Sequence, residues 1–182
     1  MKIATIGRGN VGSGLAQRWR NSGHGVTEIG SDGGDVSGVE AVLVAIPSSE
    51  IEDAFTKVTG IGDAVVIDAT NAFTGRDEGF ESLAHQIKSH VSGPVAKSFS
   101  CNFAALYDDI DNQREPPCSL YAAEDGAVEI TEQLTRDAGY HPVSAGGLGS
   151  ARMLEDHLGL MMAIVEGGTG RFFYRYAKPG EL

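Results

Sequence analysis

A glycine motif near the start of the chain constrains the fold more than any other feature of the sequence. Residues 2–6 read as a short strand rich in β-branched side chains, and a helix is predicted from the motif to about residue 21. Between them stands Gly7-Arg8-Gly9-Asn10-Val11-Gly12. The arrangement G-x-G-x-x-G between a strand and a helix is typical of a Rossmann unit that holds the pyrophosphate of a dinucleotide. The alternative is a tight turn that binds nothing.

Each glycine of this motif has a separate physical task. Gly7 permits the tight turn, Gly9 lets the backbone approach a pyrophosphate, and Gly12 lets the helix pack closely on the strand. The N-terminus of the helix then offers free N–H groups and a positive dipole end to the phosphates. The motif therefore predicts a dinucleotide site at the carboxyl end of the first strand.

The rest of the chain alternates strand and helix patterns. Further strands are expected at residues 26–30, 41–46, 64–67, 94–99, 119–123 and 141–145, and further helices at 79–90, 126–138 and 150–166. Continuous apolar runs such as residues 41–46 suit a parallel sheet that is covered on both faces. The fold class expected is α/β: a Rossmann-type, doubly wound, mostly parallel sheet. Residues 1–147 would form the dinucleotide-binding domain and residues 148–182 a short C-terminal helical cap within the same compact unit.

Composition excludes several other classes. The 182 residues carry 14 basic and 25 acidic side chains, a net charge of −11, which argues against DNA or an anionic membrane as the main partner. No apolar run reaches the roughly 20 residues that cross a bilayer. Two cysteines, Cys101 and Cys118, are too few for a disulfide scaffold, and no spacing resembles a metal site. We expect a reduced, cytoplasmic protein that acts on a small molecule.

The choice between NAD and NADP falls on the end of the second strand. An acidic residue there binds the ribose 2′-OH of NAD, whereas an arginine accommodates the 2′-phosphate of NADP. Ser31 could bind either group, Asp32 would repel a phosphate unless turned away, and Arg8 is the nearest basic residue in sequence. These residues leave both cofactors open.

A series of short segments resembles the F420-dependent NADP oxidoreductases and their small relatives, which are related to the reductase domain of the Steap metalloreductases. The resemblance covers nearly the whole chain. The segments are residues 7–12, Ser22-Gly23-His24, Gly30-Ser31, Val44-Ala45-Ile46-Pro47, Val66-Ile67-Asp68-Ala69-Thr70-Asn71, Lys97-Ser98-Phe99 and the run from Ala145 to Glu155. Their order and spacing carry the resemblance, since no single segment is decisive.

The resemblance implies NADP(H) along the carboxyl edge of the sheet, with a deazaflavin (F420) or flavin stacked beside the nicotinamide. Hydride would pass directly between the rings, so no catalytic acid or base is expected. By position, cofactor binding falls to Gly7, Arg8, Gly9, Asn10, Val11, Gly12, Ser31, Asp32, Ile46, Pro47, Thr70 and Asn71. The pocket for the second substrate would be lined by Ser98, Phe99, Ser100, Cys101 and Asn102. The resemblance also favours a homodimer, packed through the last helix.

Four departures from the family pattern bear on these implications. Asp32 stands where the family commonly has an arginine or lysine, and residues 32–40 are too few for the usual helix. The stretch Ser100-Cys101-Asn102 also differs, as does Ala72 after Asn71. Two rival interpretations follow: an NAD-dependent reductase of a small carbonyl or quinone, and a non-catalytic module that senses a dinucleotide.

Overall fold

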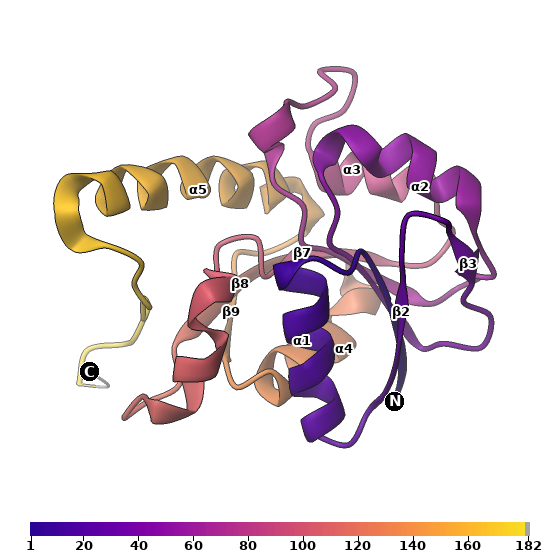
Figure 1. Cartoon of the computed structure of the whole chain (residues 1–182). Helices are drawn as coiled ribbons and strands as arrows, with labels where there is room; N and C mark the ends of the chain where they lie inside the picture. Colours follow the sequence, from indigo (N-terminus) through magenta and orange to yellow (C-terminus); the bar gives the residue numbers. More distant parts are fainter. Residues whose placement is uncertain (181–182) are drawn as a thin grey trace.

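Seven strands form the central sheet of the computed structural model, which describes residues 1–180 (Figure 1). In spatial order they are β2 (Gly25–Ile29), β1 (Lys2–Ile6), β4 (Ala41–Val44), β6 (Val65–Asp68), β7 (Val95–Ser98), β8 (Cys118–Ala123) and β9 (His141–Ser144). The first five strands of this order run parallel, whereas β8 runs antiparallel to β7 and β9 runs parallel to β8. The strands β3 (Gly34–Asp35) and β5 (Val58–Thr59) pair in a separate small ladder.

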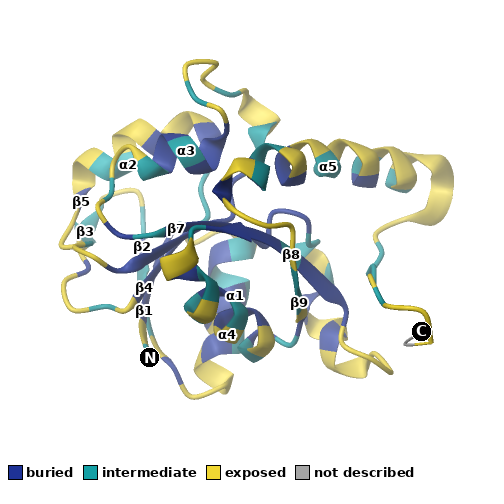
Figure 2. Ribbon diagram, turned by 180° about the vertical axis from the view of Figure 1, so that it is seen from behind, coloured by how far each residue is buried: buried dark blue, intermediate teal, exposed yellow. Residues whose placement is uncertain are grey.

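Helices cover both faces of the sheet, which gives three layers (Figures 1 and 2). One face carries α1 (Asn10–Asn21), the 3₁₀ segment η3 (Ala104–Asn112) and α4 (Val128–Asp137); the other carries α2 (Ile51–Lys57), α3 (Leu83–Lys88) and α5 (Ala151–Ile164). Shorter helical segments are η1 (Ser48–Glu50), η2 (Ala72–Thr74), η4 (Asp125–Ala127), η5 (Leu148–Ser150) and η6 (Val165–Thr169).

A separate apolar core lies on each face of the sheet. Trp19 of α1 and Leu134 of α4 are fully buried in one core, and Ile51, Leu83 and Leu154 are buried in the other. All four residues of β4 and of β6 are buried, as expected for central parallel strands that lie between two layers. The centre of the sheet is therefore shielded from solvent on both faces.

The predicted Rossmann-type, mostly parallel fold with a C-terminal helix is confirmed, with differences in detail. The helix expected over residues 79–90 is only α3, because the Ser82 side chain caps it by accepting a hydrogen bond from the His85 amide. The helix α2 and the segment η3 were not predicted. The nine-residue stretch expected to be too short for a helix contains only β3.

The end of the described chain folds back over the sheet. After η6 the chain returns beside β8, where the Cys118 amide donates to the Tyr174 carbonyl at 2.9 Å and Phe172 packs edge-on against Phe103. Within residues 1–180, no helix combines the length and the apolar character needed to span a bilayer. The boundary between residues 147 and 148 remains a prediction, and residues 181–182 of the expected cap lie outside the described chain.

Candidate functional site: the carboxyl edge of the sheet

The glycine loop lies where the sheet reverses its strand order. β1 lies between β2 and β4, so the connection after β1 runs to one side of it and the later connection to β4 runs to the other side. Such a reversal leaves a crevice at the carboxyl ends of the strands. Gly7 has φ +109°, and a Cβ there would lie 2.2 Å from the Ala45 carbonyl oxygen. A Cβ on Gly12 would lie 2.0 Å from the Gly7 carbonyl oxygen. These two glycines are therefore required by the close approach of helix, turn and neighbouring strand.

Gly9 is different, because nothing packs against it. A Cβ on Gly9 would meet no atom within 4 Å, and its φ of −78° suits any residue. Gly9 caps α1, and its carbonyl accepts the Ser13 amide, which leaves the amides of residues 10–12 without partners inside the helix. The first turn of α1 contains no acidic residue. This end of the helix is therefore built to receive an anion over Gly9.

A pocket of about 440 Å³ opens on the β2 side of the glycine loop. It brings together seven of the residues predicted to bind the cofactor: Gly7, Arg8, Gly9, Ser31, Asp32, Ile46 and Pro47. Residues of α2 that sequence reasoning missed complete it, including Asp53 and Lys57. We call it the β2-side pocket. Its walls come from the ends of β1, β2 and β4 and from α2.

Arg8 holds a fixed position in the β2-side pocket. Its Nη2 and Nε atoms donate to the Glu28 carbonyl oxygen at 2.9 and 3.3 Å. The guanidinium lies over Gly30, where an added Cβ would meet Nη1 at 3.2 Å. The Glu28 carboxylate turns away to Ser13 and Arg20, whose hydrogen bonds lower its pKa, Ser13 contributing most. A cation therefore occupies the place just after β2 where an NAD-binding carboxylate would stand.

Other charges in the β2-side pocket belong to exposed side chains. Asp32 lies exposed on the turn after β2. Lys57 pairs with Asp53, and that hydrogen bond is the main reason its pKa is raised; Glu50 and Asp32 add to the effect. Both Asp32 and Lys57 are free to turn into solvent, so Arg8 is the one basic group here that the backbone holds in place.

A second pocket, of about 490 Å³, opens on the other side of the glycine loop. We call it the α5-side pocket. Its floor contains Val11, Asn71, Ser100, Cys101 and Asn102, and its apolar wall is formed by Phe73, Phe103, Ala104, Leu158, Met161, Met162 and Val165, with Gly170 and Arg171 at the end. Asn71 donates from Nδ2 to the Ser100 carbonyl at 3.0 Å, while its buried Oδ1 has no partner. The two pockets together follow the edge from β2 to β7, four strand spacings or about 19 Å.

Five of the predicted site residues line neither pocket: Asn10 and Gly12 in the first turn of α1, and Thr70, Ser98 and Phe99. Ser98 is fully buried, with its hydroxyl directed to the Leu120 carbonyl, and Phe99 lies in the core against Trp19 and Tyr140. Thr70 is 1% exposed, and both its amide and its hydroxyl donate to Asp68. Of the residues expected to line the second-substrate pocket, only those from Ser100 onward do so. Of Thr70 and Asn71, only Asn71 lines a pocket.

The backbone at Phe99 explains this correction. Phe99 has φ +62°, which is rare for a bulky residue and costs on the order of 1–3 kcal/mol. This turn sends the ring into the core and directs the next three residues to the α5-side pocket. The strain is stored directly beside the candidate site.

Cys101 lines the α5-side pocket as a free, buried thiol. Burial raises its pKa to about 11, opposed by a hydrogen bond from Ser100 and by the charge of Lys97. Relative to an ordinary thiol with a pKa of 9.0, the thiolate fraction at pH 8 falls about a hundredfold.

We expect iodoacetamide to label Cys101 at least fifty times more slowly at pH 8 in the folded protein than in guanidinium, as measured by peptide mass spectrometry. Equal rates would show an exposed or activated thiol.

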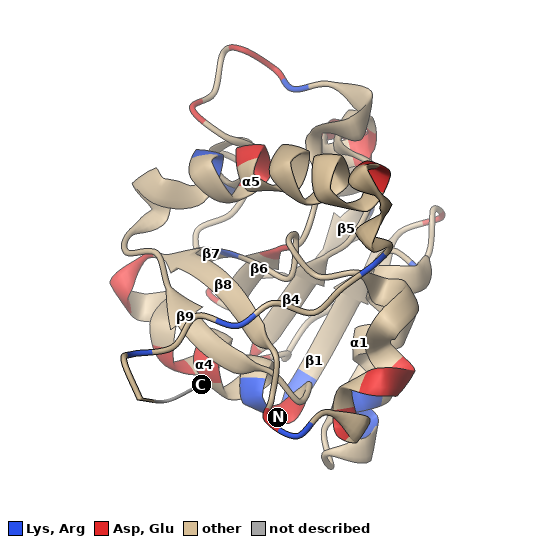
Figure 3. Ribbon diagram, turned by 90° about the vertical axis from the view of Figure 1, so that its left-hand side faces the viewer, with Lys and Arg blue, Asp and Glu red and all other residues tan. Residues whose placement is uncertain are grey.

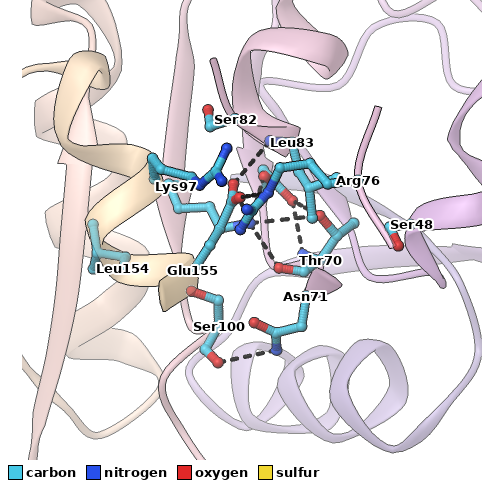
Figure 4. Close-up of polar contacts among 12 residues, drawn as sticks. Ser48, Thr70, Asn71, Arg76, Ser82, Leu83, Lys97, Ser100, Leu154 and Glu155 are labelled. Carbon is cyan, nitrogen blue, oxygen red and sulfur yellow. Dashed lines mark hydrogen bonds and ion pairs between the residues drawn. The ribbon is translucent and has the colours of Figure 1, made fainter. Parts of the chain in front are cut away.

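A buried charge network, which the sequence analysis missed, lies beneath the α5-side pocket (Figure 4). The Lys97 ammonium contacts Asp68 Oδ2 at 2.7 Å, the Thr70 carbonyl at 2.6 Å and Glu155 Oε1 at 3.5 Å. Arg76 donates from Nε to Glu155 Oε2 at 2.9 Å. The side chains of Lys97, Asp68 and Glu155 have no solvent exposure. Lys97 lies inside an otherwise largely apolar strand, and this was the one feature of the sequence that could have indicated the network.

Comparisons with solved structures match this fold. A comparison with family models finds no match, and neither does one with curated protein sequences. The structure is similar to that of a protein from Arthrobacter sp. FB24 proposed to be an F420-dependent NADP reductase, with a TM-score of 0.79, 21% identity and coverage of 98% of this chain and 100% of that one. A hypothetical protein from Sinorhizobium meliloti gives 0.68 and 24% over 83% of this chain and 88% of that one.

A larger protein shares the fold as well. The reductive aminase of Aspergillus terreus, solved in complex with NADPH and ethyl levulinate, gives a TM-score of 0.66 and 14% identity over 92% of this chain and 62% of that one. At these identities the similarity establishes a Rossmann-type fold. The family resemblance seen in the sequence is therefore matched at the level of the fold.

Proposed function

We propose that the protein is an NADPH-dependent oxidoreductase that transfers hydride between the nicotinamide and a flat acceptor of the F420 or flavin type. The observation that carries this proposal is the pair of pockets on one sheet edge, joined by an anion-binding glycine loop. The β2-side pocket suits the adenosine half, the loop suits the pyrophosphate, and the α5-side pocket has room for a nicotinamide and a second ring system.

Each part of the edge has a separate task in this proposal. The amides of residues 10–12 bind the pyrophosphate, while Ile46 and Pro47 support the chain between the two halves. Asn71 offers an acceptor to the nicotinamide carboxamide, and the apolar side chains of α5 exclude water. Bound NADPH supplies the hydride, so the protein contributes proximity and orientation rather than an acid or base.

Arg8 favours NADPH over NADH. Its guanidinium lies over Gly30, where NAD-binding proteins place a carboxylate, and Asp32 is exposed and free to turn away. Asp32 keeps the NAD-dependent alternative open. An Asp32→Arg variant tests it: if Asp32 selects the cofactor, NADPH affinity rises relative to that for NADH, and no change removes Asp32 from the choice.

The acceptor is tested by steady-state oxidation of NADPH with F420 or FMN. We expect turnover with one of these acceptors, and a Phe103→Ala variant should raise the KM for the acceptor more than that for NADPH because Phe103 is an aromatic side chain of the pocket in which we propose that the acceptor stacks. NADPH binding without turnover of either acceptor, or of a small quinone or carbonyl compound, would indicate the non-catalytic sensing module instead.

The outer face of α5 suits a second copy of the chain. The exposed large apolar side chains of the described residues are Phe73, Met153, Leu160, Ile164 and Tyr176, all in η2, α5 or the tail after it. Met153, Leu160 and Ile164 follow one face of α5 at i, i+7 and i+11, and residues 157–165 contain no Lys, Arg, Asp or Glu (Figure 3). The helix extends beyond the body of the molecule (Figure 2). We propose a homodimer through this face.

Light scattering after size exclusion tests this dimer. Leu160 is 58% exposed, so Leu160→Glu should leave the fold intact and convert a dimer of the wild-type protein into a monomer. Gln17→Glu, on the exposed face of α1, is the matched control and should remain dimeric. A wild-type protein that stays monomeric over the whole concentration range of the experiment would contradict the proposal.

A further inference from the structure

The buried charge network connects both walls of the α5-side pocket to a single ammonium group. We propose that Lys97 is a positioning residue: it sets the spacing of these walls and thereby seats the nicotinamide end of a bound dinucleotide. This inference rests on the proposed function. It assigns a role to a residue that touches no pocket itself.

The first wall is the segment that follows β6. The Lys97 ammonium binds the Thr70 carbonyl and Asp68 Oδ2, and Asp68 Oδ1 accepts the amide and hydroxyl of Thr70 at 2.7 and 2.6 Å. The next residue is Asn71, whose amide group lines the pocket and bonds to Ser100. Lys97 thus fixes the backbone directly before the pocket floor.

The second wall is α5. Glu155, in the first turns of this helix, faces Lys97 at 3.5 Å and also accepts the Leu83 amide at 2.9 Å and Arg76 at 2.9 Å. Leu158 and Met162 follow Glu155 at i+3 and i+7, so the face of the helix held by the network is the face that lines the pocket. A shift of Glu155 would move these side chains with it.

The buried ion pairs around Lys97 indicate that this network fixes the positions of the two walls rather than adding to the stability of the fold. Two buried carboxylates, Asp68 and Glu155, face the cations Lys97 and Arg76, and the ammonium contacts three different residues. Arg76 also pairs with the exposed Asp156 at 3.2 Å. Buried ion pairs are often no more stable than apolar side chains of similar volume. An apolar side chain lacks directed contacts, however, and so would leave the separation of the two walls unspecified.

The test compares two ligands on a Lys97→Met variant by calorimetry. NADPH reaches both pockets, whereas adenosine 2′,5′-bisphosphate reaches the β2-side pocket alone. We expect the Kd of NADPH to rise at least tenfold and the Kd of the bisphosphate to change less than twofold. At saturating acceptor, the factor by which kcat falls should exceed the factor by which the KM for NADPH rises. Lys88→Met removes a lysine ion pair with Glu124, away from the site, and should change neither affinity.

A second variant keeps the inference testable if Lys97→Met does not fold. Glu155→Gln keeps the size and the acceptor for the Leu83 amide but removes the charge that faces Lys97, and we expect the same selective loss, about threefold to tenfold. Unchanged NADPH affinity in a folded variant, or equal loss of both ligands, would overturn the inference. A wild-type protein that binds neither ligand would instead contradict the proposed function.

Discussion

A Gly9→Val variant should fold as the parent protein does and lose NADPH binding by a factor of at least a hundred. A Cβ added at Gly9 meets no atom within 4 Å, and a φ of −78° is ordinary for valine. Its branched side chain would fill the space through which a pyrophosphate reaches the amides of residues 10–12. A hundredfold loss corresponds to about 2.7 kcal/mol of binding free energy. Calorimetry measures the affinity, and circular dichroism with thermal unfolding measures the fold.

Gly147→Val is the matched control for this variant. Gly147 is also an exposed cap with nothing within 4 Å, and its φ of −67° and ψ of 171° resemble those of Gly9, but it lines neither pocket. The control should bind NADPH as the parent does. Gly7 and Gly12 are unsuitable for this test because any side chain on them would clash with backbone. A Gly9→Val protein that is folded and still binds tightly would place the cofactor site elsewhere.

The second large effect is expected at Arg8. An Arg8→Gln variant should lose NADPH affinity by about tenfold to a hundredfold, since a hydrogen bond to a charged group contributes about 1.5–3 kcal/mol. NADH affinity should change less than threefold, because the ribose 2′-OH carries no charge. The Glu28 carbonyl that Arg8 now binds is exposed enough for water to replace the guanidinium. The ratio of the two dissociation constants is the measurement.

Arg20→Gln provides the control for the loss of charge. Arg20 binds the carboxylate of the same Glu28 at 2.8 Å and does not line the β2-side pocket. It should leave the ratio of NADPH to NADH affinity unchanged. If Arg8→Gln lowers the affinity for NADPH and for NADH equally, then Arg8 supports the loop and does not bind the 2′-phosphate.

The sequence alone predicts the sheet well because its central strands are buried on both faces. Continuous apolar runs such as residues 41–46 leave little choice of structure, and the glycine motif fixes the first strand, turn and helix. The helix α2 escaped prediction because only Ile51 among its residues is fully buried, so its apolar periodicity is weak. The strand β8 was expected over residues 119–123, but its antiparallel direction was not, because the residue pattern of a strand is the same for either direction.

The candidate site was predictable where it depends on local backbone and not where it depends on distant pairing. Gly7, Gly9 and Gly12 lie within six consecutive residues, so their spacing in the sequence is enough to predict the loop. Lys97 meets Asp68 and Glu155 only through the fold, from 29 and 58 residues away in the chain. The left-handed turn at Phe99 is likewise invisible in the sequence, because glycine is the residue expected at a positive φ.

The most direct test of the central claim is thermal unfolding of the unmodified protein without ligand, with NADPH and with NADH. A ligand at a hundred times its Kd stabilises the folded state by about 2.7 kcal/mol. For a chain of this length that raises Tm by roughly 5–10 °C. We expect this rise with NADPH and a clearly smaller one with NADH at equal concentration. No rise with either at 1 mM, a concentration on the order of the weakest useful affinities, would contradict a dinucleotide site at the glycine loop.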